Sequence, residues 1–445
     1  MTNSILVFQY FSESLIAYFF GIRKKPEIYF SGKCIVENTS YRLPQSASSD
    51  WLIVLKVLRK ILLKILKKES IEAIFDQRRN TLIFDGTNSN FSLRERYVRF
   101  HTGMDANLIA RDQLQFSGFS MPFLFSFIFT LIFVFPLLIW SFFSVNRANI
   151  GLILLEYIEC CNLLLFCKKN SIRKIFVFCP YEKDSNLVSL ILMKNGITVS
   201  KHPSPGPLMT HNSVLVADEV VLSSQYQMEE LVFYKETMFV KKVLKWYPEF
   251  SLTYIDRYKN KLLTTPSNTV GYYSHGSWLR KAMGHTSDNM NVADSEAAVL
   301  KCLNNFLQNN KQVKLIIFPH PREKQASQWR NTIEHYQSIF LDLAIEINTD
   351  KIPTALSFDS VDVAVSAFST IVYERLFCGF KTLIASFGIL NFPVPGSSLN
   401  NIVVKNEKDF TEKLLTALQS DPDMFFTGNK LSGYRYADYR SVDFT

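Results

Sequence analysis

The apolar run at residues 313–318 ends in side chains that suit an anionic ligand. His320, Pro321 and Arg322 follow it in the stretch "VKLIIFPHPREK". An imidazole can donate a hydrogen bond to a phosphate, and a guanidinium presents a planar set of donors. Pro321 restricts the chain direction directly after the histidine. A single histidine at a strand end is usually structural, so a second strand end of this kind is needed to indicate a site.

That second strand end follows the apolar run at residues 361–366. Ser366, Ser369 and Thr370 come after it, just before a helical pattern. Free backbone N–H groups and the helix dipole favour an anion at such a position, and a phosphate is the natural guest. Glu374, one turn further on, can accept hydrogen bonds from sugar or ribose hydroxyls. The alternative is a simple N-cap, with the glutamate in solvent.

A third polar strand end is Ser274-His275-Gly276, after the apolar stretch "TVGYY". Open α/β sheets bind ligands beyond the carboxyl ends of their strands. We therefore expect His275, His320 and Ser366 to line one sheet edge that faces another domain. His275 is also a candidate base, because a histidine near its ordinary pKa can take a proton from a hydroxyl at neutral pH.

The elements that must position these side chains form an alternating pattern. From about residue 172 onward, short apolar strands alternate with helical patterns, such as those at about 294–309 and 324–340. This alternation predicts parallel sheets with helices on both faces, and hence an α/β fold. The polar, turn-rich stretch 258–269 predicts a domain boundary. The predicted domains are residues 1–258 and 270–425, and residues 426–445 form a tail that can cross back.

Two of these stretches together carry a resemblance to a known family. "IIFPHPRE" followed by the spacing SxxSTxxxE resembles the signatures of bacterial two-domain GT-B glycosyltransferases. The likeness is greatest to the sialyltransferase and polysialyltransferase group, and CDP-glycerol and Kdo transferases look similar in the same places. It covers mainly residues 270–390. It implies two Rossmann-like domains facing a cleft, with a His-Pro motif and a Ser-Ser/Thr motif that grip the CMP part of CMP-sialic acid. The donor-nucleotide residues expected on this basis are Ser274, Gly276, His320, Pro321, Arg322, Ser366, Ser369, Thr370 and Glu374.

The resemblance also implies an acidic catalytic base beside a D/E-D/E-G motif in the first, acceptor-binding domain. The near match is Phe84-Asp85-Gly86, which has one carboxylate instead of two. Asp85 is therefore the expected base. Asp218-Glu219 is a rival that lacks the following glycine, and His275 is a third candidate.

The expected transfer needs neither a metal nor a cofactor. A base deprotonates the acceptor hydroxyl, while cationic and N–H groups stabilise the leaving phosphate. His320, Arg322 and the helix start at Ser369-Thr370 suit the second task, and no D-x-D motif lies in a suitable loop. The seven cysteines form no C-x-x-C pair, and no Cys/His cluster has the spacing of zinc ligands. We expect transfer with inversion.

Two other stretches indicate contact with a membrane. Residues 121–145 are uncharged but are interrupted by Pro136, which favours a broken hairpin dipping into one leaflet over a simple span. Residues 51–68 form a basic amphipathic pattern that suits an anionic membrane surface. A buried core helix and a solvated domain helix are the respective alternatives. The net charge of +9 fits an anionic lipid partner better than a nucleic acid, because no groove-reading motif is present.

The sequence as a whole predicts a glycosyltransferase at the cytoplasmic face of a bacterial inner membrane. Its expected donor is a CMP-linked sugar of the sialic-acid or Kdo type, and its expected acceptor is a lipid-linked glycan of a surface polysaccharide. A UDP- or GDP-sugar transferase and a CDP-polyol phosphotransferase are the alternative enzymes. The alternative of another class is a non-catalytic component of polysaccharide assembly or export.

Overall fold

The computed structural model describes most of both domains. The described residues are 2–38, 59, 76, 78–85, 91–110, 160–178, 186–203, 205–208, 214–258, 265, 267–283, 292–350, 353–387, 392–435 and 443–444. The two stretches expected at the membrane, 51–68 and 121–145, lie outside these residues apart from Arg59. Within the described residues, no helix combines the length and the apolar character needed to cross a bilayer.

The first domain is built on a seven-stranded sheet with the order β13-β6-β5-β4-β3-β1-β2. Its strands are β1 (Thr81–Asp85), β2 (Asn107–Ala110), β3 (Lys174–Phe178), β4 (Thr198–His202), β5 (Leu215–Leu222), β6 (Met238–Lys245) and β13 (Asp443–Phe444). All neighbours are parallel except β13, which runs antiparallel to β6. The strand order reverses between β1 and β3, with β2 on one side of β1 and β4 to β6 beyond β3.

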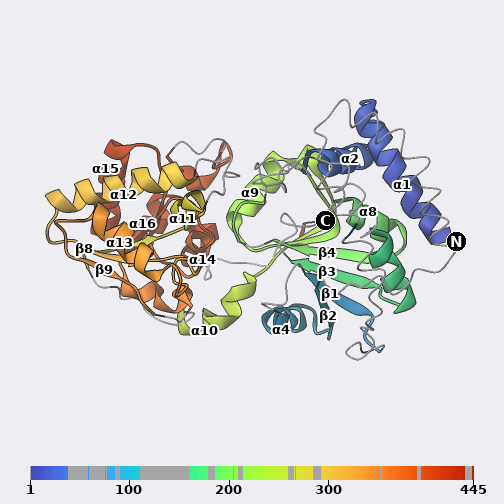
Figure 1. The fold of residues 1–445 in the computed structure, drawn as a ribbon, viewed down its shortest axis with the longest axis horizontal. Helices are drawn as coiled ribbons and strands as arrows, with labels where there is room; N and C mark the ends of the chain where they lie inside the picture. The colour runs from blue at the N-terminus through green and yellow to red at the C-terminus, as the bar shows by residue number, and fades with distance from the viewer. Residues whose placement is uncertain are drawn as a thin grey trace.

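Helices cover both faces of this sheet (Figure 1). They are α1 (Thr2–Phe19), α2 (Pro26–Asn38), α4 (Phe91–Thr102), α8 (Asn186–Lys194) and α9 (Gln225–Phe233). Successive strand residues point to opposite faces, so Ile175 packs with α1 and α8 while its neighbour Phe176 packs with α4. The apolar strand sequence is explained by this burial on both sides.

The second domain is built on a six-stranded sheet with the order β12-β11-β10-β7-β8-β9, and every pairing in it is parallel. Its strands are β7 (Thr269–Tyr273), β8 (Lys314–Phe318), β9 (Ile345–Ile347), β10 (Val363–Ser366), β11 (Thr382–Ala385) and β12 (Val403–Val404). Numbered from its first strand, this is the Rossmann order 3-2-1-4-5-6. The order reverses between β7 and β10, which is where a doubly wound sheet opens a ligand crevice.

The helices of the second domain surround that sheet on both faces (Figure 1). They are α11 (Ser277–Ala282), α12 (Val292–Asn309), α13 (Trp329–Ile339), α14 (Ile371–Phe377), α15 (Glu407–Gln419) and α16 (Pro422–Gly428). The helix expected at 324–340 begins only at Trp329, because the chain after His320 first forms turns held by N–H bonds from Glu323 and Lys324 to the His320 carbonyl. Two parallel-sheet α/β domains, as the sequence predicts, are confirmed.

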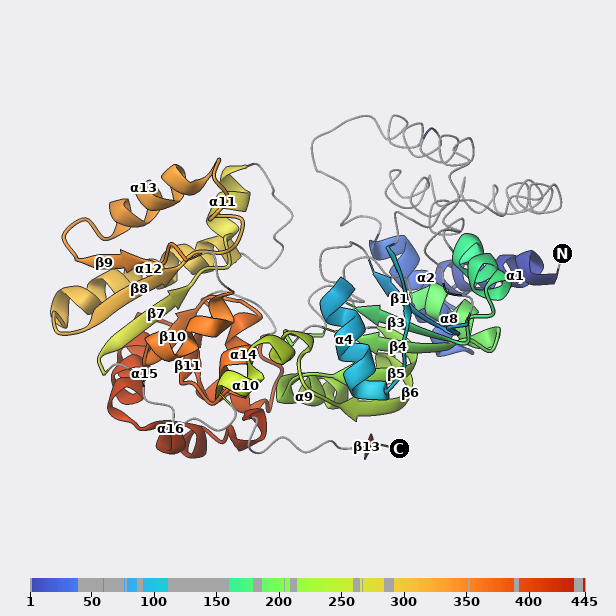
Figure 2. The same cartoon turned by 90° about the horizontal axis from the view of Figure 1, so that it is seen from below.

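The chain between the two sheets runs through two short helices, η5 (Glu249–Thr253) and α10 (Ile255–Tyr258). Figure 2 shows α9 and α10 lying between the domains. The Ser397 hydroxyl and the Tyr434 hydroxyl of the second domain both donate to Glu229 of α9, at 2.6 and 3.0 Å. The pairing of β13 with β6 returns the C-terminal residues to the first sheet.

Candidate functional site

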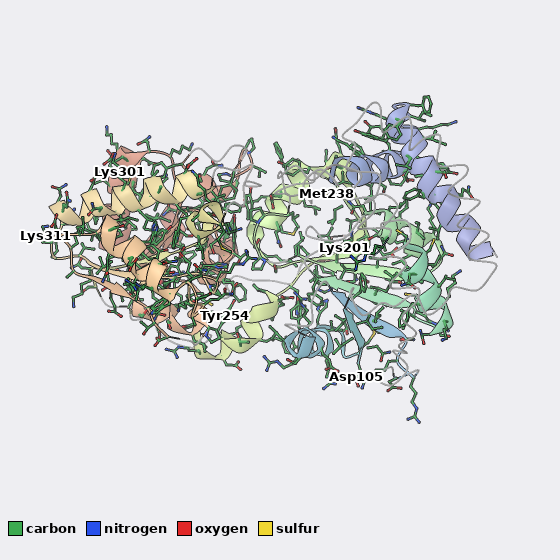
Figure 3. The ribbon with its side chains drawn as sticks, viewed as in Figure 1. Asp105, Lys201, Met238, Tyr254, Lys301 and Lys311 are labelled. Carbon is green, nitrogen blue, oxygen red and sulfur yellow. The ribbon has the colours of Figure 1, made fainter. Side chains whose placement is uncertain are left out.

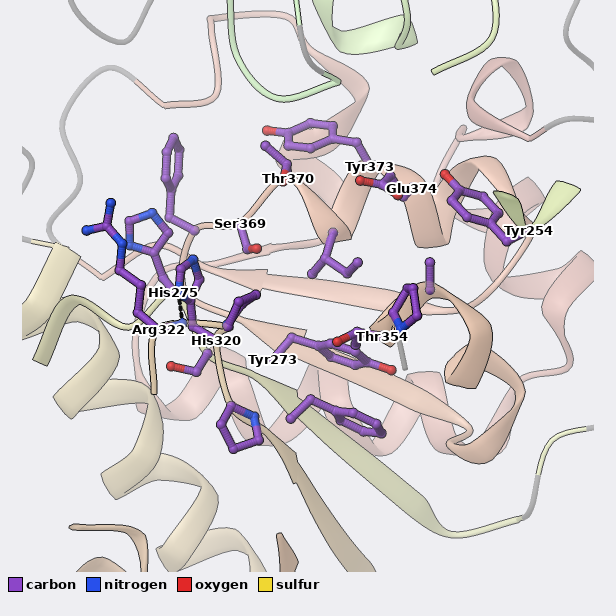
Figure 4. Close-up of a pocket in the computed structure, with 18 of the residues that line it drawn as sticks. Tyr254, Tyr273, His275, His320, Arg322, Thr354, Ser369, Thr370, Tyr373 and Glu374 are labelled. Atoms are coloured by element: carbon purple, nitrogen blue, oxygen red, sulfur yellow. Dashed lines mark hydrogen bonds between the residues drawn. The ribbon is translucent and has the colours of Figure 1, made fainter. Parts of the chain in front are cut away.

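A cavity of about 580 Å³ opens at the carboxyl ends of β7, β8 and β10 (Figure 4). It lies at the reversal of strand order in the second sheet, where the topology predicts a ligand. Eight of the residues expected from the sequence line it: Ser274, His275, His320, Pro321, Arg322, Ser369, Thr370 and Glu374. Gly276 and Ser366 are not among the lining residues. Arg280, Tyr254, Thr354, Phe368 and Pro207 are lining residues that the sequence did not single out.

His320 is held as a neutral ring with one free donor. Its Nδ1 accepts the backbone N–H of Arg322 at 3.2 Å, so the neutral tautomer carries its proton on Nε2. Burial, with the charges of Arg280 and Arg322, lowers the pKa of His320 to about 4. At neutral pH the ring therefore offers Nε2–H as a hydrogen-bond donor to a ligand in the cavity.

His275 is also neutral and lies against a guanidinium. The Ser277 hydroxyl and Nη2 of Arg280 lie 2.6 and 2.9 Å from its Nδ1. Arg280 also donates to the His275 carbonyl at 2.8 Å. Burial, followed by the charges of Arg280, His320 and Arg322, lowers the pKa of His275 to about 3. A base whose conjugate acid is this strong is weak at neutral pH, so His275 in this state is a poor general base.

A glycine is required at position 276 for two reasons: its backbone angle, and the close approach of His320. Its φ of +70° lies in the left-handed region. A Cβ placed on Gly276 would come 3.1 Å from the Cβ of His320. Gly276 therefore brings the β7 loop close to the β8 loop and does not itself contact the cavity.

The loop after β7 is organised by Glu296 of α12, a side chain with 1% exposure. Its carboxylate accepts the backbone N–H groups of His275 and Ser277, both at 2.7 Å. It also accepts the Ser274 hydroxyl at 3.3 Å, while Ser274 accepts the Gly276 N–H at 2.9 Å. Burial raises the pKa of Glu296, and the backbone hydrogen bonds from His275 and Ser277 oppose that shift. Ser274 was expected to bind the ligand, but its hydroxyl is used in hydrogen bonds within this loop.

The loop after β8 is organised in the same way by Glu323, which is fully buried. Its carboxylate accepts the backbone N–H of His320, the indole N–H of Trp278 and the Tyr336 hydroxyl, the last at 2.9 Å. Trp278 belongs to α11, directly after the His275 loop. Glu323 therefore ties the two histidine loops to each other.

Ser366 and Arg375 hold together the strands and loops beside the cavity. The Ser366 hydroxyl donates to the Tyr273 carbonyl at 2.8 Å, which joins the ends of β10 and β7. The guanidinium of Arg375, also fully buried, donates to the Tyr273 hydroxyl and to the Phe358 carbonyl, both at 2.9 Å. Ser366, expected as a donor-binding residue, is thus a structural residue here.

The other end of the cavity is formed by Glu374 with Tyr254, whose side chains lie together in Figure 4. The pKa of Glu374 is raised to about 7, chiefly by burial; a hydrogen bond from Tyr254 lowers it and the charge of Glu249 raises it. Glu374 is the one carboxylate among the described lining residues. The cavity is therefore polarised, with both arginines and both histidines at one end and a partly protonated carboxyl at the other (Figure 4).

The first domain contributes a wall through the loop at residues 205–208. Pro207 lines the cavity, and a Cβ on Gly206 would lie 3.1 Å from Cγ2 of Thr370. The Gly206 carbonyl accepts from the Gln227 side chain at 2.9 Å, and Glu230 accepts the N–H of Leu208 at 2.6 Å. The two domains therefore meet at Thr370, just before α14.

The acidic residues expected in the first domain lie in two places. Asp85 is the last residue of β1, at the carboxyl edge where the order of the first sheet reverses; its side chain and Gly86 lie outside the described part. Asp218 and Glu219 lie inside β5, where each carboxylate is 2.6 Å from a lysine, Lys241 and Lys174 respectively. These ion pairs occupy the rival base candidates.

Sequence reasoning missed Arg280, Glu296 and Glu323. Glu323 stands inside the quoted stretch "PHPRE", but nothing in a single sequence reveals that its side chain turns back onto the His320 N–H. Arg280 follows His275 by five residues, and only the short helix α11 turns it onto that ring. Within the described residues, no group of three His, Cys, Asp or Glu side chains is placed to hold a metal ion.

No family model matches the chain, and no curated protein matches its sequence. Several solved structures are similar in fold. The S. aureus MnaA–UDP structure shares 9% identity over 79% of this chain and 91% of that chain, with a TM-score of 0.45. The UDP-GlcNAc 2-epimerase of Neisseria meningitidis bound to UDP-GlcNAc shares 10% identity over 80% and 96%, with a TM-score of 0.43. The O-GlcNAc transferase of Thermobaculum terrenum shares 10% identity over 97% and 78%, with a TM-score of 0.39. Similarity at this level assigns neither a family nor an activity to this chain.

Proposed function

We propose that the protein is a glycosyltransferase that binds a nucleotide-sugar donor in this cavity. The observation that carries the proposal is the clustering of four nitrogen-bearing side chains at the reversal of strand order. They are His275, Arg280, His320 and Arg322. Two arginines with two neutral imidazoles form a donor-rich surface that suits a phosphate, and the departing nucleotide is the group that gains charge during transfer.

The proposed chemistry assigns a task to each side of the cleft. The carboxylate of Asp85 takes the proton of the acceptor hydroxyl, and the acceptor oxygen forms a bond to the anomeric carbon. The bond from that carbon to the nucleotide phosphate breaks, and the phosphate leaves with the electron pair. His320 donates Nε2–H to the phosphate, and Arg280 and Arg322 supply positive charge. Attack opposite the leaving group gives inversion.

The proposed donor is a CMP-linked sugar of the sialic-acid or Kdo type, as the resemblance of the His-Pro and Ser-Ser/Thr stretches implies. Such a donor carries a sugar carboxylate beside its single phosphate. Two anionic groups close together suit the paired cations of Arg280 and Arg322. A diphosphate donor of the UDP, GDP or CDP kind presents two anionic groups as well, so the nucleotide must be identified by binding.

The proposed acceptor is a lipid-linked glycan at the cytoplasmic face of the membrane. The basic stretch 51–68 and the uncharged stretch 121–145 support this part, together with the net charge of +9. A non-catalytic assembly component would bind the same ligand without turning it over, and turnover distinguishes the two.

Calorimetric titration with CMP, CDP, UDP and GDP tests the donor site. We expect one nucleotide to bind clearly more tightly, and His320→Ala to weaken it by roughly 10- to 150-fold, the value of one hydrogen bond to a charged group. Arg330→Ala is the control, because this arginine of α13 is 90% exposed and is not among the residues that line the cavity. If His320→Ala folds normally and binds every nucleotide as tightly as the wild type, the donor site is elsewhere.

A further inference from the structure

The turn between α1 and α2 displays large apolar side chains on the surface of the first domain. Phe20 is 66% exposed and Ile22 is 47% exposed. Arg23, Lys24 and Lys25 follow directly, and all three are exposed. The turn lies at the periphery of the first domain (Figure 1). None of these residues has a part in the proposed transfer.

The backbone holds this turn in a defined shape. Gly21 has a φ of +66°, the N–H of Ile22 bonds to the Ala17 carbonyl at 2.8 Å, and the N–H of Gly21 bonds to the Tyr18 carbonyl at 3.2 Å. This is the Schellman arrangement that closes a helix. In that arrangement the residue in the position of Ile22 commonly packs back on its own helix, yet here about half of the residue stays exposed.

The hairpin that carries the turn is fixed to the domain. Phe11 and Leu15 of α1 are buried in the core beneath the first sheet. A Cβ on Gly32 of α2 would lie 1.9 Å from the Ser14 carbonyl oxygen, so the two helices cross in direct backbone contact. The exposed pair is therefore presented by a rigid support.

A second exposed pair lies directly before a turn that touches the same hairpin. Val232 and Phe233, at the end of α9, are 71% and 49% exposed. The turn that follows, Lys235–Thr237, contacts α2, and Lys235 is exposed. With Ile16, these two pairs make up five of the ten exposed large apolar residues in the described part of the chain. Phe20 and Ile22, two large apolar side chains exposed on one turn, are candidates for an interaction surface.

We infer that the α1–α2 turn is a membrane-contact site that inserts Phe20 and Ile22 among the lipids of an anionic bilayer. The charge pattern selects this partner. Apolar side chains followed by Arg23, Lys24 and Lys25 match a lipid interface, where the apolar groups enter the acyl boundary and the cations meet phosphate headgroups. The inference rests on the proposed function in one respect: the lipid-linked acceptor is the reason for the protein to be at a membrane.

A depth measurement on the full chain tests the inference. A nitroxide label is placed at Ile22→Cys, and a matched label at Leu341→Cys, an apolar residue of the second domain that is 80% exposed. The five cysteines whose side chains the structure describes are all buried, and labelled wild-type protein gives the background. On vesicles of phosphatidylcholine with phosphatidylglycerol, the label at 22 should gain contact with oxygen and lose contact with a water-soluble nickel chelate. The label at 341 should stay in water. A label at 22 that stays in water on bound protein would overturn the inference, as would one that is immobilised without vesicles by a second copy of the chain.

The electrostatic part has its own test. Lys24→Gln should weaken partition onto the same vesicles by roughly fivefold, the effect of one lysine near an anionic surface. Lys311→Gln should leave it unchanged, because that lysine lies at the far end of the second domain (Figure 3). Equal effects of the two changes would overturn the assignment. Nucleotide binding by Lys24→Gln should match the wild type; if neither protein binds a nucleotide, the proposed function fails while the membrane contact still stands.

Discussion

Replacing Glu323 by glutamine removes the tie between the two histidine loops while hardly changing the shape of the side chain. The carboxylate is fully buried, and the groups that face it are the His320 N–H, the Trp278 indole N–H and the Tyr336 hydroxyl. All three are donors, whereas a glutamine amide offers one acceptor oxygen and two further N–H groups. At least one of the three donors must therefore lose its partner.

The expected loss of stability follows from the number of buried donors left unpaired. An unpaired buried donor costs about 1–3 kcal/mol. Burial raises the pKa of Glu323, so part of this cost is offset when the desolvated charge is removed. We expect a net loss of about 2 kcal/mol in the free energy of unfolding, or about 4–8 °C in Tm for a domain of this size. The amide oxygen can keep Trp278 and Tyr336, the two donors that share Oε1, which leaves the His320 N–H on Oε2 without its anchor. Nucleotide affinity should therefore fall roughly tenfold or more.

Urea denaturation, nucleotide calorimetry and ¹⁵N spectra of the imidazoles measure these effects separately. Tyr336→Phe is the matched control: it removes one donor, keeps the carboxylate on His320, and should cost about 1 kcal/mol of stability without loss of affinity. The spectra report the His320 tautomer without any ligand, so they test the support even if no nucleotide binds. The reasoning is refuted if Glu323→Gln keeps wild-type affinity and an unchanged His320 spectrum, or if Tyr336→Phe loses as much affinity.

Three further outcomes follow from the site. Asp85→Asn should lower turnover by about 10²–10⁴-fold with nucleotide binding intact, as measured by transfer assay and calorimetry; near-normal turnover in Asp85→Asn, with loss in His275→Ala, would move the base to His275. Because burial raises the pKa of Glu374 from its ordinary 4.5 to about 7, its folded form binds a proton more tightly than its unfolded form, and stability should fall by about 2–3 kcal/mol between pH 5 and pH 8. Urea titrations should show that Glu374→Gln removes that decline, and an unchanged decline would contradict it. His320, with a pKa lowered to about 4, should titrate near that value by NMR and shift upward when the nucleotide binds, because a bound anion favours the charged ring.

Much of the second domain could be predicted from its sequence because its strands are apolar on both faces. Apolar runs such as Leu315–Phe318 are typical of parallel strands buried on both faces, and turn residues follow them directly. The edges of helices were less predictable. α13 begins at Trp329, later than expected, because Glu323 turns inward and its own backbone N–H bonds back to His320.

The residues of the site also divide into those that the sequence could predict and those that it could not. His275, His320 and Glu374 could be placed in one cleft because strand ends of a parallel sheet converge. Ser366 could not be told apart from a ligand residue, because a buried serine that bonds to the Tyr273 carbonyl and an exposed serine that binds phosphate have the same sequence context. The supporting role of Glu296 was invisible, since it acts across about twenty residues from a different helix.

The two reversals of strand order indicate where the proposed transfer would take place. The cavity occupies the reversal between β7 and β10, with its cationic end toward His275 and Arg280. An anionic phosphate bound at the cationic end would place the uncharged part of the donor at the Glu374 end, and this fixes the orientation of the donor in the cavity. An acceptor must then approach from the first domain, whose own reversal lies between β1 and β3. Asp85 ends β1 at that position, whereas the rival carboxylates lie inside β5 in ion pairs. Under the proposed function, the strand topology and the ion pairs of β5 therefore favour Asp85, the residue that the Asp-Gly motif indicates, as the base.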